Sequence, residues 1–208
     1  MAGKHLLLVE GKDDQHVIYA IRDFYNIDKE SFKIQDKEGI DNLFEGFEAN
    51  LIEGSAAIER IGIVIDADVD LNARWQKTGA VLERAGYRDL PAAPDPAGLV
   101  HAQEFLPTVG VWIMPDNRLH GMLEDFLVYL VPVGSRVWEK AVEASQEVSA
   151  MDEETFSEIH LSKAQIHAYL AWQKEPGKPF GTAITAKYLE AGTPQCTAFA
   201  DWLRRLFT

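Results

Sequence analysis

The most constraining stretch of the sequence is IGIVIDADVD, residues 61–70, where an apolar run ends in acids at alternate positions. A run of this kind is typical of a buried strand in a parallel sheet. Because alternate residues of an extended chain point the same way, we expect Asp66, Asp68 and Asp70 to lie together at the carboxyl end of that strand. Close carboxylates repel one another unless a proton or a cation lies between them. The stretch therefore indicates a site for Mg²⁺, Mn²⁺ or Ca²⁺, which prefer oxygen ligands.

The apolar pattern around this stretch predicts an α/β fold. We expect strands over residues 5–10, 31–36, 59–66 and 109–114, and helices over residues 12–25, 40–54, 72–85 and 121–131. Gly11 permits a tight turn after the first strand, and Asp13 or Asp14 can cap the helix that follows. Residues 90–98 are proline-rich and must form a loop. The order βαβαβα predicts a doubly wound, mainly parallel sheet.

The last third of the chain has a different, helical pattern. We expect residues 1–134 to form the α/β domain and residues 135–208 a helical extension packed on its sheet, the two making one compact unit. Within the extension, helices are expected over residues 136–148, from the acidic run that begins at Asp152 to Gln173, and around Phe199–Leu206. A turn-rich break is expected at residues 175–181.

Charge and cysteine usage bear on partners and compartment. The formal charge is −13, and no basic cluster is visible, which weakens a nucleic-acid interpretation without excluding it, since bound metal ions would neutralise clustered acids. A nucleic acid or nucleotide, a protein partner or a second copy of the chain all remain open. Cys196 is the one cysteine, so no internal disulfide forms. The apolar run in MAGKHLLLVEGKDD is too short for a signal peptide or membrane span, so we expect a cytoplasmic protein without a membrane partner.

Other acids are expected at the same edge of the sheet. Ligands of open α/β sheets lie beyond the carboxyl ends of the strands. Glu10 ends the first strand, Asp116 follows the strand over residues 109–114, and Glu124 and Asp125 lie on the next helix. Acids at several strand ends are hard to explain by stability, whereas one or two divalent metals explain them.

These residues carry a resemblance to a known superfamily. The segment VEGKDD, followed later by VIDADVD, resembles the Toprim pattern, in which a glutamate ends the first strand and DxD ends a later one. Topoisomerases, bacterial-type primases and overcoming-lysogenization-defect nucleases share that pattern. More closely, the chain resembles a small bacterial family of Toprim-like proteins of unassigned function, related to those nucleases. The matching segments are LLVEGKDD, GIVIDADVDLNARWQ, GVWIMPDNRLHGMLEDFL, KAQIHAYLAWQKEPGKPFGTAI and FADWLRRLF.

The resemblance implies roles for the acids. Glu10 would be the general acid/base or a metal ligand, and Asp66 and Asp68 would hold Mg²⁺ or Mn²⁺. Asp70 matches an acid often found after DxD, and Glu124 is a candidate for a second metal. The remaining candidates are Gly11 and Lys12 beside phosphate, and Asp116, Asp125 and Lys163 around the site. The implied chemistry is metal-dependent phosphoryl transfer, most directly nuclease-like hydrolysis of phosphodiesters in nucleic acid.

Two other interpretations remain open. A haloacid-dehalogenase-like phosphatase would use Asp66 as its nucleophile, although it leaves Glu10 without a role. A non-catalytic accessory module that binds metal or nucleotide fits the charge of −13. Individual acids also have local explanations, because Asp70 is able to cap a helix and Asp116 suits a turn.

Overall fold

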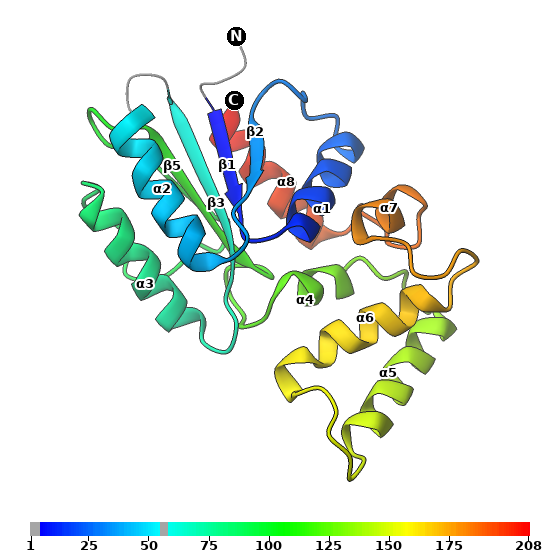
Figure 1. Cartoon of the computed structure of the whole chain (residues 1–208). Coiled ribbons are helices and arrows are strands. Elements are labelled where there is room, and N and C mark those ends of the chain that lie inside the picture. The colour runs from blue at the N-terminus through cyan, green and yellow to red at the C-terminus, as the bar shows by residue number, and fades with distance from the viewer. Residues whose placement is uncertain (1–4, 55–57) are drawn as a thin grey trace.

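The computed structural model describes residues 5–54 and 58–208, and it contains a five-stranded sheet in the order β2-β1-β3-β5-β4 (Figure 1). Four strands run parallel, and the edge strand β4 is antiparallel to β5. The strands are β1 (His5–Val9), β2 (Lys33–Asp36), β3 (Arg60–Asp66), β4 (Leu99–His101) and β5 (Thr108–Met114). The prediction of an α/β fold with a mainly parallel sheet is confirmed.

Helices cover both faces of this sheet. Along β1, Leu7 and Val9 pack on one face, whereas Leu6 and Leu8 pack on the other, as the alternation of a strand requires. The first face is covered by α1 (Lys12–Phe24) and α8 (Pro194–Phe207), and the second by α2 (Ile40–Gly54) and α3 (Leu71–Arg84). The strands β1, β3 and β5 are therefore buried on both faces, which explains their continuous apolar runs in the sequence.

The last helix, α8, lies close against the sheet because two glycines face it. Gly62 of β3 and Gly110 of β5 are register partners. A Cβ atom added at Gly110 would lie 2.4 Å from Leu206 of α8, and one added at Gly62 would lie 2.8 Å from the same side chain. The small residues thus provide the space into which Leu206 packs.

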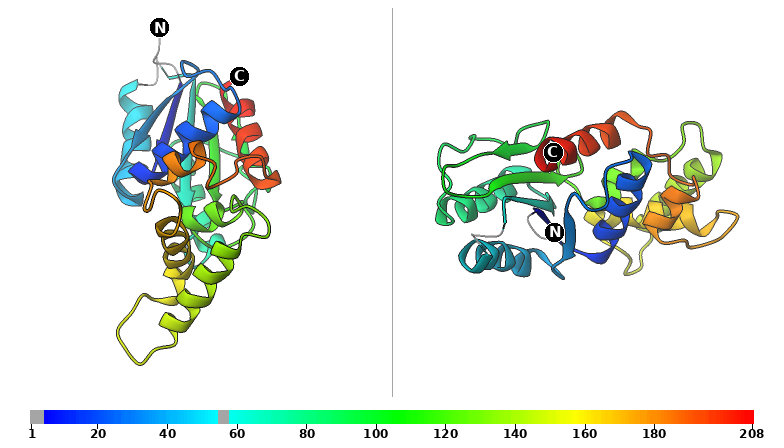
Figure 2. Two further views of the ribbon diagram at one scale, coloured as in Figure 1. Left: turned by 90° about the vertical axis from the view of Figure 1, so that its right-hand side faces the viewer. Right: turned by 90° about the horizontal axis from the view of Figure 1, so that it is seen from above.

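The helices between β5 and α8 lead away from the sheet. They are α4 (Leu123–Val128), α5 (Arg136–Ser149), α6 (Leu161–Ala171) and α7 (Phe180–Thr185), with the 3-10 turn η1 (Glu158–His160) before α6. The pair α5 and α6 projects beyond the carboxyl ends of the strands, with α6 resting on α4, while α7 packs on α1 (Figure 2). Within residues 135–208, α8 is therefore the helix that packs directly on the sheet.

Four local predictions were wrong. β4 was missed because three residues are too few to show a strand period. The helix expected over residues 121–131 is α4 alone, since Gly121 has a φ of +135° that is incompatible with a helix. Residues 152–157 form no helix, as their adjacent acids are exposed and repel one another. α7 begins inside the break expected at residues 175–181.

Candidate functional site

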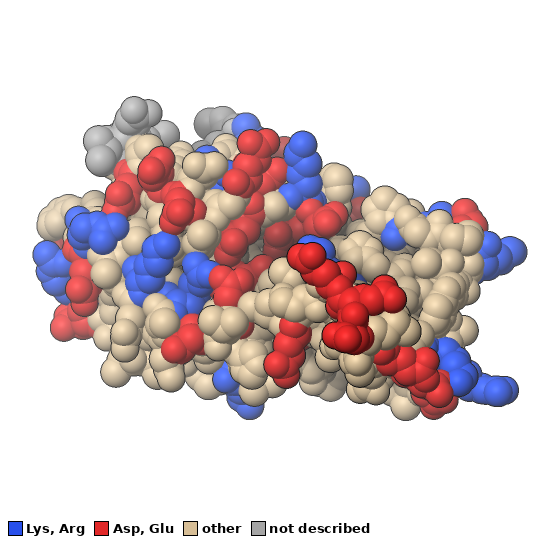
Figure 3. Space-filling model, turned by 60° about the horizontal axis from the view of Figure 1, so that its bottom comes forward, with Lys and Arg blue, Asp and Glu red and all other residues tan. Residues whose placement is uncertain are grey.

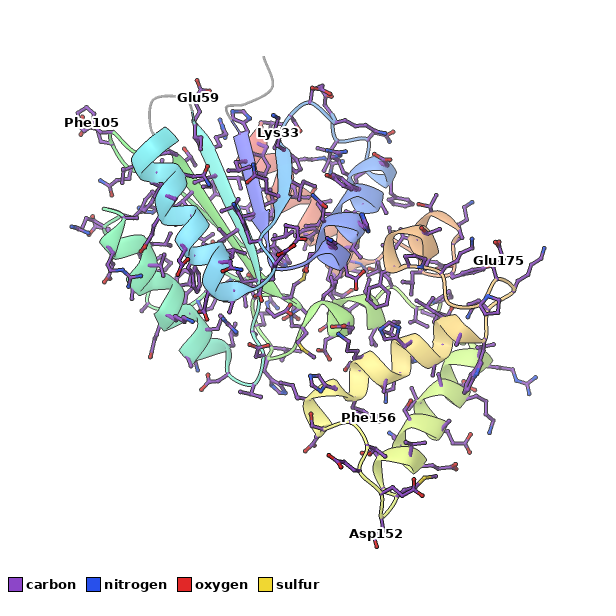
Figure 4. All side chains as sticks on the ribbon, in the orientation of Figure 1. Lys33, Glu59, Phe105, Asp152, Phe156 and Glu175 are labelled. Carbon is purple, nitrogen blue, oxygen red and sulfur yellow. The ribbon has the colours of Figure 1, made fainter. Side chains whose placement is uncertain are left out.

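The predicted site lies at the carboxyl ends of β1 and β3, which are neighbours in the sheet. Lys33 and Glu59, at the amino ends of β2 and β3, lie at the top of Figure 4, so the strands point toward α4 and α6. Asp152 marks the far end of the loop between α5 and α6 in the same view. The site thus lies between the sheet and the projecting helices.

Hydrogen bonds join Glu10, Asp66 and the start of α4. The Asp66 backbone N–H donates to Oε1 of Glu10 at 2.8 Å. The Leu123 backbone N–H donates to Oδ1 of Asp66 at 3.0 Å, so one of the free amides at the beginning of α4 is satisfied by the end of β3. The two carboxylates that the Toprim resemblance singles out are therefore brought together, and each is fixed by a backbone amide.

Asp14 is a third acid of this site. Its side chain is buried, and its Oδ2 accepts a hydrogen bond from the Gly11 backbone N–H at 3.1 Å. Gly11 has an extended backbone with φ −143°, so the turn itself does not require glycine. A Cβ atom at this position would lie 3.3 Å from Oδ2 of Asp14, which is a tight contact. Glycine thus permits the close approach of Asp14, a different reason from the turn that we predicted.

Glu124 of α4 adds a fourth carboxylate, and Lys163 of α6 is its partner. Glu124 is 6% exposed, and the Lys163 ammonium lies 2.9 Å from its Oε1. Asp125 has a structural task instead, since it accepts hydrogen bonds from the Met122 amide and from the hydroxyl of Ser162. Of these two neighbouring acids, Glu124 therefore faces the site, whereas Asp125 links α4 to α6.

Glu10, Asp14, Asp66 and Glu124 are called the acid cluster below, because their charges influence one another. Burial raises the pKa of Asp66 well above its ordinary value, and the charges of Asp14, Glu10 and Glu124 add to the rise. Burial followed by the charge of Glu10 raises the pKa of Asp14 from 3.8 to about 7. Burial also raises the pKa of Glu10, although the Asp66 amide opposes it. The raised pKa values mean that the surroundings do not fully compensate these carboxylates when all of them are ionised.

Asp68 and Asp70 do not follow Asp66 as the alternation predicted. The strand ends at Asp66, and Asp68 has a φ of +53°, so the chain is no longer extended. The Asp68 carboxylate forms an ion pair with Arg74 of α3. Asp70 is the N-cap of α3 and accepts from the amides of Asn72 and Ala73. The expectation that the three aspartates point the same way was wrong, since a turn and a helix start directly after the strand.

Two further candidates are engaged locally or exposed. Asp116 accepts from the Arg118 and Leu119 amides in its own turn and from the Tyr129 hydroxyl at 3.2 Å. Lys12 is exposed at the first position of α1. Among the described residues, no hydrogen bond or ion pair joins Asp116 or Lys12 to the acids of the site.

The acid cluster retains oxygen atoms for a cation, although its side chains do not form a closed cage. Among the described residues, no group of three or more His, Cys, Asp and Glu side chains is arranged as a metal site. Within residues 5–54 and 58–208, the hydrogen bonds of Glu10 and Asp66 use Oε1 and Oδ1, which leaves Oε2 and Oδ2. The donor chemistry fits Mg²⁺ or Mn²⁺, and binding requires these carboxylates to close around the ion. Figure 3 shows that acids spread across this face, with Lys and Arg gathered beside them over α2 and α3.

Two residues of this region were missed by the sequence analysis. Asp14 was treated only as a possible helix cap, and Arg74 was not considered. The signal for Asp14 was its position one helical turn after Gly11, which returns its side chain to the end of β1. Arg74 lies one turn into the helix that Asp70 caps, so its side chain reaches back toward Asp68.

Comparisons with known proteins give the family of the chain. No curated protein and no solved structure matches it. Within the part of the chain that the structure describes, no helix has the length and apolar character needed to cross a bilayer. The family model described as "Protein of unknown function (DUF3226)" matches residues 4–208, which is nearly the whole sequence, and the chain belongs to that family.

Proposed function

We propose that the chain is a Toprim-like protein that hydrolyses phosphodiesters of nucleic acid with Mg²⁺ or Mn²⁺. The observation that carries this proposal is the acid cluster, whose members come from α1, β3, α4 and the residue after β1. In this cluster, burial and then the charges of Asp14, Glu10 and Glu124 raise the pKa of Asp66. A buried carboxylate without a counter-charge lowers stability, so packing alone gives no reason to gather them. A bound divalent cation does.

The sheet order supports the Toprim interpretation. The two strands that carry the motif, β1 and β3, are separated in sequence by β2 and α2 but pair directly in the sheet. Glu10 and Asp66, the ends of those strands, are consequently within hydrogen-bond reach. In the haloacid-dehalogenase alternative, Glu10 would have no role beside the nucleophile, which does not account for this contact.

The chain's own groups suit the reaction. A divalent ion, when bound, neutralises phosphate charge and lowers the pKa of a coordinated water. Glu10, whose pKa is raised by burial, is suited to accept or donate a proton. Lys163 places a positive charge beside Glu124 and Asp66, where it is able to contact a phosphate oxygen. Gly11 gives its amide to Asp14, so its predicted phosphate contact requires Asp14 to move.

A pocket next to the acid cluster favours nucleic acid over a small phosphate ester. It is lined by Phe156, His160, Lys163, Ala164 and His167 and has a volume of about 420 Å³. Aromatic and imidazole rings are surfaces on which bases stack. Lys163 lines this pocket and pairs with Glu124 of the acid cluster, so a base in the pocket would lie near the carboxylates.

The test is a Mn²⁺-dependent cleavage assay on single- and double-stranded DNA and RNA. Wild type is compared with Glu10→Gln and Asp66→Asn, which keep an oxygen to accept the amide hydrogen bonds, and with the exposed control Glu83→Gln. We expect each of the first two substitutions to lower the rate about a hundredfold or more, and the control to leave it unchanged. Cleavage that survives both site substitutions contradicts the proposal. Metal binding without cleavage favours the accessory module instead.

A further inference from the structure

Arg74 is a largely buried cation at the border of the acid cluster, and the proposed reaction does not yet use it. Its side chain is 11% exposed, whereas Arg84, three turns further along α3, is 62% exposed. Both arginines pair with a carboxylate, Arg74 with Asp68 and Arg84 with Glu48. Burial distinguishes Arg74 from an ordinary surface ion pair, because removing a guanidinium from water has a free-energy cost that an exposed pair avoids.

The guanidinium of Arg74 also lies within electrostatic reach of Glu10. Burial raises the pKa of Glu10, and the Asp66 amide and the positive charge of Arg74 both oppose that rise. Arg74 is thus adjacent both to the proposed general base and to Asp68. The Arg74 guanidinium is therefore able to contact one oxygen of a phosphate while a bound metal ion joins the other oxygens of that phosphate to the acid cluster.

An open pocket lies where such a phosphate would bind. Its volume is about 250 Å³, and it is lined by Ala67, Asp68, Val69, Asp70, Ala73, Arg74 and Lys77. Lys77 lies one turn after Arg74 on α3 and is paired with the exposed Asp41. Two positively charged side chains from one face of α3 therefore line the pocket, together with the residues that follow β3.

Asp68 is held in place by its backbone rather than by its side chain. It adopts a left-handed φ of +53°, and a reciprocal pair of backbone hydrogen bonds, of 2.9 and 2.8 Å, joins it to Gly121. This conformation is uncommon for residues other than glycine. The backbone thus fixes the position of Asp68, while its side chain is 44% exposed and pairs with Arg74.

We infer that Arg74 binds a phosphodiester oxygen of a nucleic-acid strand, and that the Asp68 carboxylate occupies the place of this phosphate in the unbound protein. The inference rests on the proposed function for its ligand class. The planar guanidinium matches two oxygens of a phosphate as well as it matches a carboxylate. When the strand binds, the phosphate replaces Asp68 at Arg74, and Asp68 is released toward Asp66. Lys77 contributes a second, weaker contact along the strand.

The test measures binding, not turnover. Fluorescence anisotropy of labelled single-stranded DNA and RNA oligonucleotides is recorded in EDTA at low ionic strength, where metal-dependent cleavage is absent. We expect Arg74→Gln to weaken binding about tenfold and Arg84→Gln to leave it near wild type. Asp68→Asn frees the guanidinium, so it is expected to tighten binding. A purely structural ion pair predicts that both single substitutions weaken binding, so the Asp68→Asn variant distinguishes the two explanations.

The double variant Asp68→Asn/Arg74→Gln shows whether Asp68→Asn acts by freeing Arg74 or only by removing a negative charge from the surface. If Asp68 acts through Arg74, the tightening by Asp68→Asn disappears in the Arg74→Gln background. Tightening that is equal in both backgrounds overturns the inference, as does wild-type affinity in Arg74→Gln or an absence of binding by wild type. Arg74→Lys, which keeps the charge, should retain part of the affinity and guards against misfolding of the glutamine variant.

The two proposals fail in different ways. Cleavage abolished by Asp66→Asn, together with strand binding that ignores Arg74, overturns this inference and leaves the proposed function in place. Strand binding that depends on Arg74 without cleavage supports the inference while the proposed hydrolysis fails. DNA and RNA oligonucleotides of one sequence show which strand is preferred.

Discussion

Two groups of acids lie along one edge of the sheet, and they differ in what surrounds them. Asp70, Asp116 and Asp125 each accept hydrogen bonds from backbone amides of their own turn or helix start. The acid cluster also receives amide hydrogen bonds, but Asp14 and Glu124 are buried beside the half-buried Glu10 and Asp66, and burial with mutual repulsion raises the pKa of Asp66 and Asp14. The first group is explained by local structure, and the second is not.

This difference shows that position at a strand end does not by itself indicate a functional carboxylate. Asp116 follows β5 as Asp66 ends β3, yet its charge is used by a turn and by Tyr129. The better guide is whether local partners compensate the charge of the carboxylate. A carboxylate without such partners requires a positive charge from a bound ligand or ion. Asp68 is intermediate, because its partner Arg74 is a side chain that another anion can take over.

The largest expected difference between the acid cluster and the capping acids is the effect of pH on stability in the absence of metal. The pKa of Asp14 is raised by burial and by Glu10 from 3.8 to about 7, so the folded state keeps a proton that the unfolded state has lost within this window. The free energy of unfolding contributed by Asp14 therefore falls as pH rises from about 4 to about 7. Asp14→Asn, which cannot ionise, should match wild type near the acid end and exceed it by about 4 kcal/mol above the window.

Urea denaturation in EDTA at several pH values measures this difference. Asp70→Asn provides the matched control, because asparagine also caps helices well and the Asp70 carboxylate is exposed. The difference in the free energy of unfolding between Asp70→Asn and wild type should not grow with pH. If Asp14→Asn gains no stability relative to wild type as pH rises, the acid cluster is compensated by groups other than a bound cation, and the contrast with the capping acids disappears.

A second test concerns the effect of metal on stability. We expect saturating Mn²⁺ to raise the free energy of unfolding of wild type by about 2 to 3 kcal/mol at a hundredfold excess over Kd. Asp66→Asn should remove this gain, since it takes away a ligand, while Asp116→Asn should retain it. Thermal unfolding with and without EDTA provides the measurement. An equal gain in all three proteins would mean that metal binds elsewhere.

The sequence was sufficient to predict the four parallel strands and to place Glu10 and Asp66 at strand ends. The apolar runs at residues 5–9 and 60–66 were unambiguous because both faces of β1 and β3 are buried. Glu10 and Asp66 followed from the rule that ligands gather at carboxyl ends. The pairing of β1 with β3, which brings these acids together, is a tertiary fact that spacing alone does not contain.

Other features could not be predicted from the local sequence pattern. The aspartates after β3 alternate as strand residues do, but the left-handed conformation of Asp68 and the cap at Asp70 end the alternation. Asp14 could be placed near Glu10 only once the geometry of the helix start was known. The projection of α5 and α6 away from the sheet depends on the packing of α6 on α4, which involves residues distant in sequence.

The smallest expected effect belongs to Asp70, and it tests the other half of the comparison. Its carboxylate caps α3 at 2.9 and 3.0 Å from the Asn72 and Ala73 amides. Asp70→Ala should therefore lower the free energy of unfolding by about 1 kcal/mol, whereas Asp70→Asn should change it by a few tenths. Urea denaturation with and without Mn²⁺ separates capping from ligation. The loss in Asp70→Ala should be the same with and without metal. A loss that appears only with Mn²⁺ would make Asp70 a ligand and move it into the acid cluster.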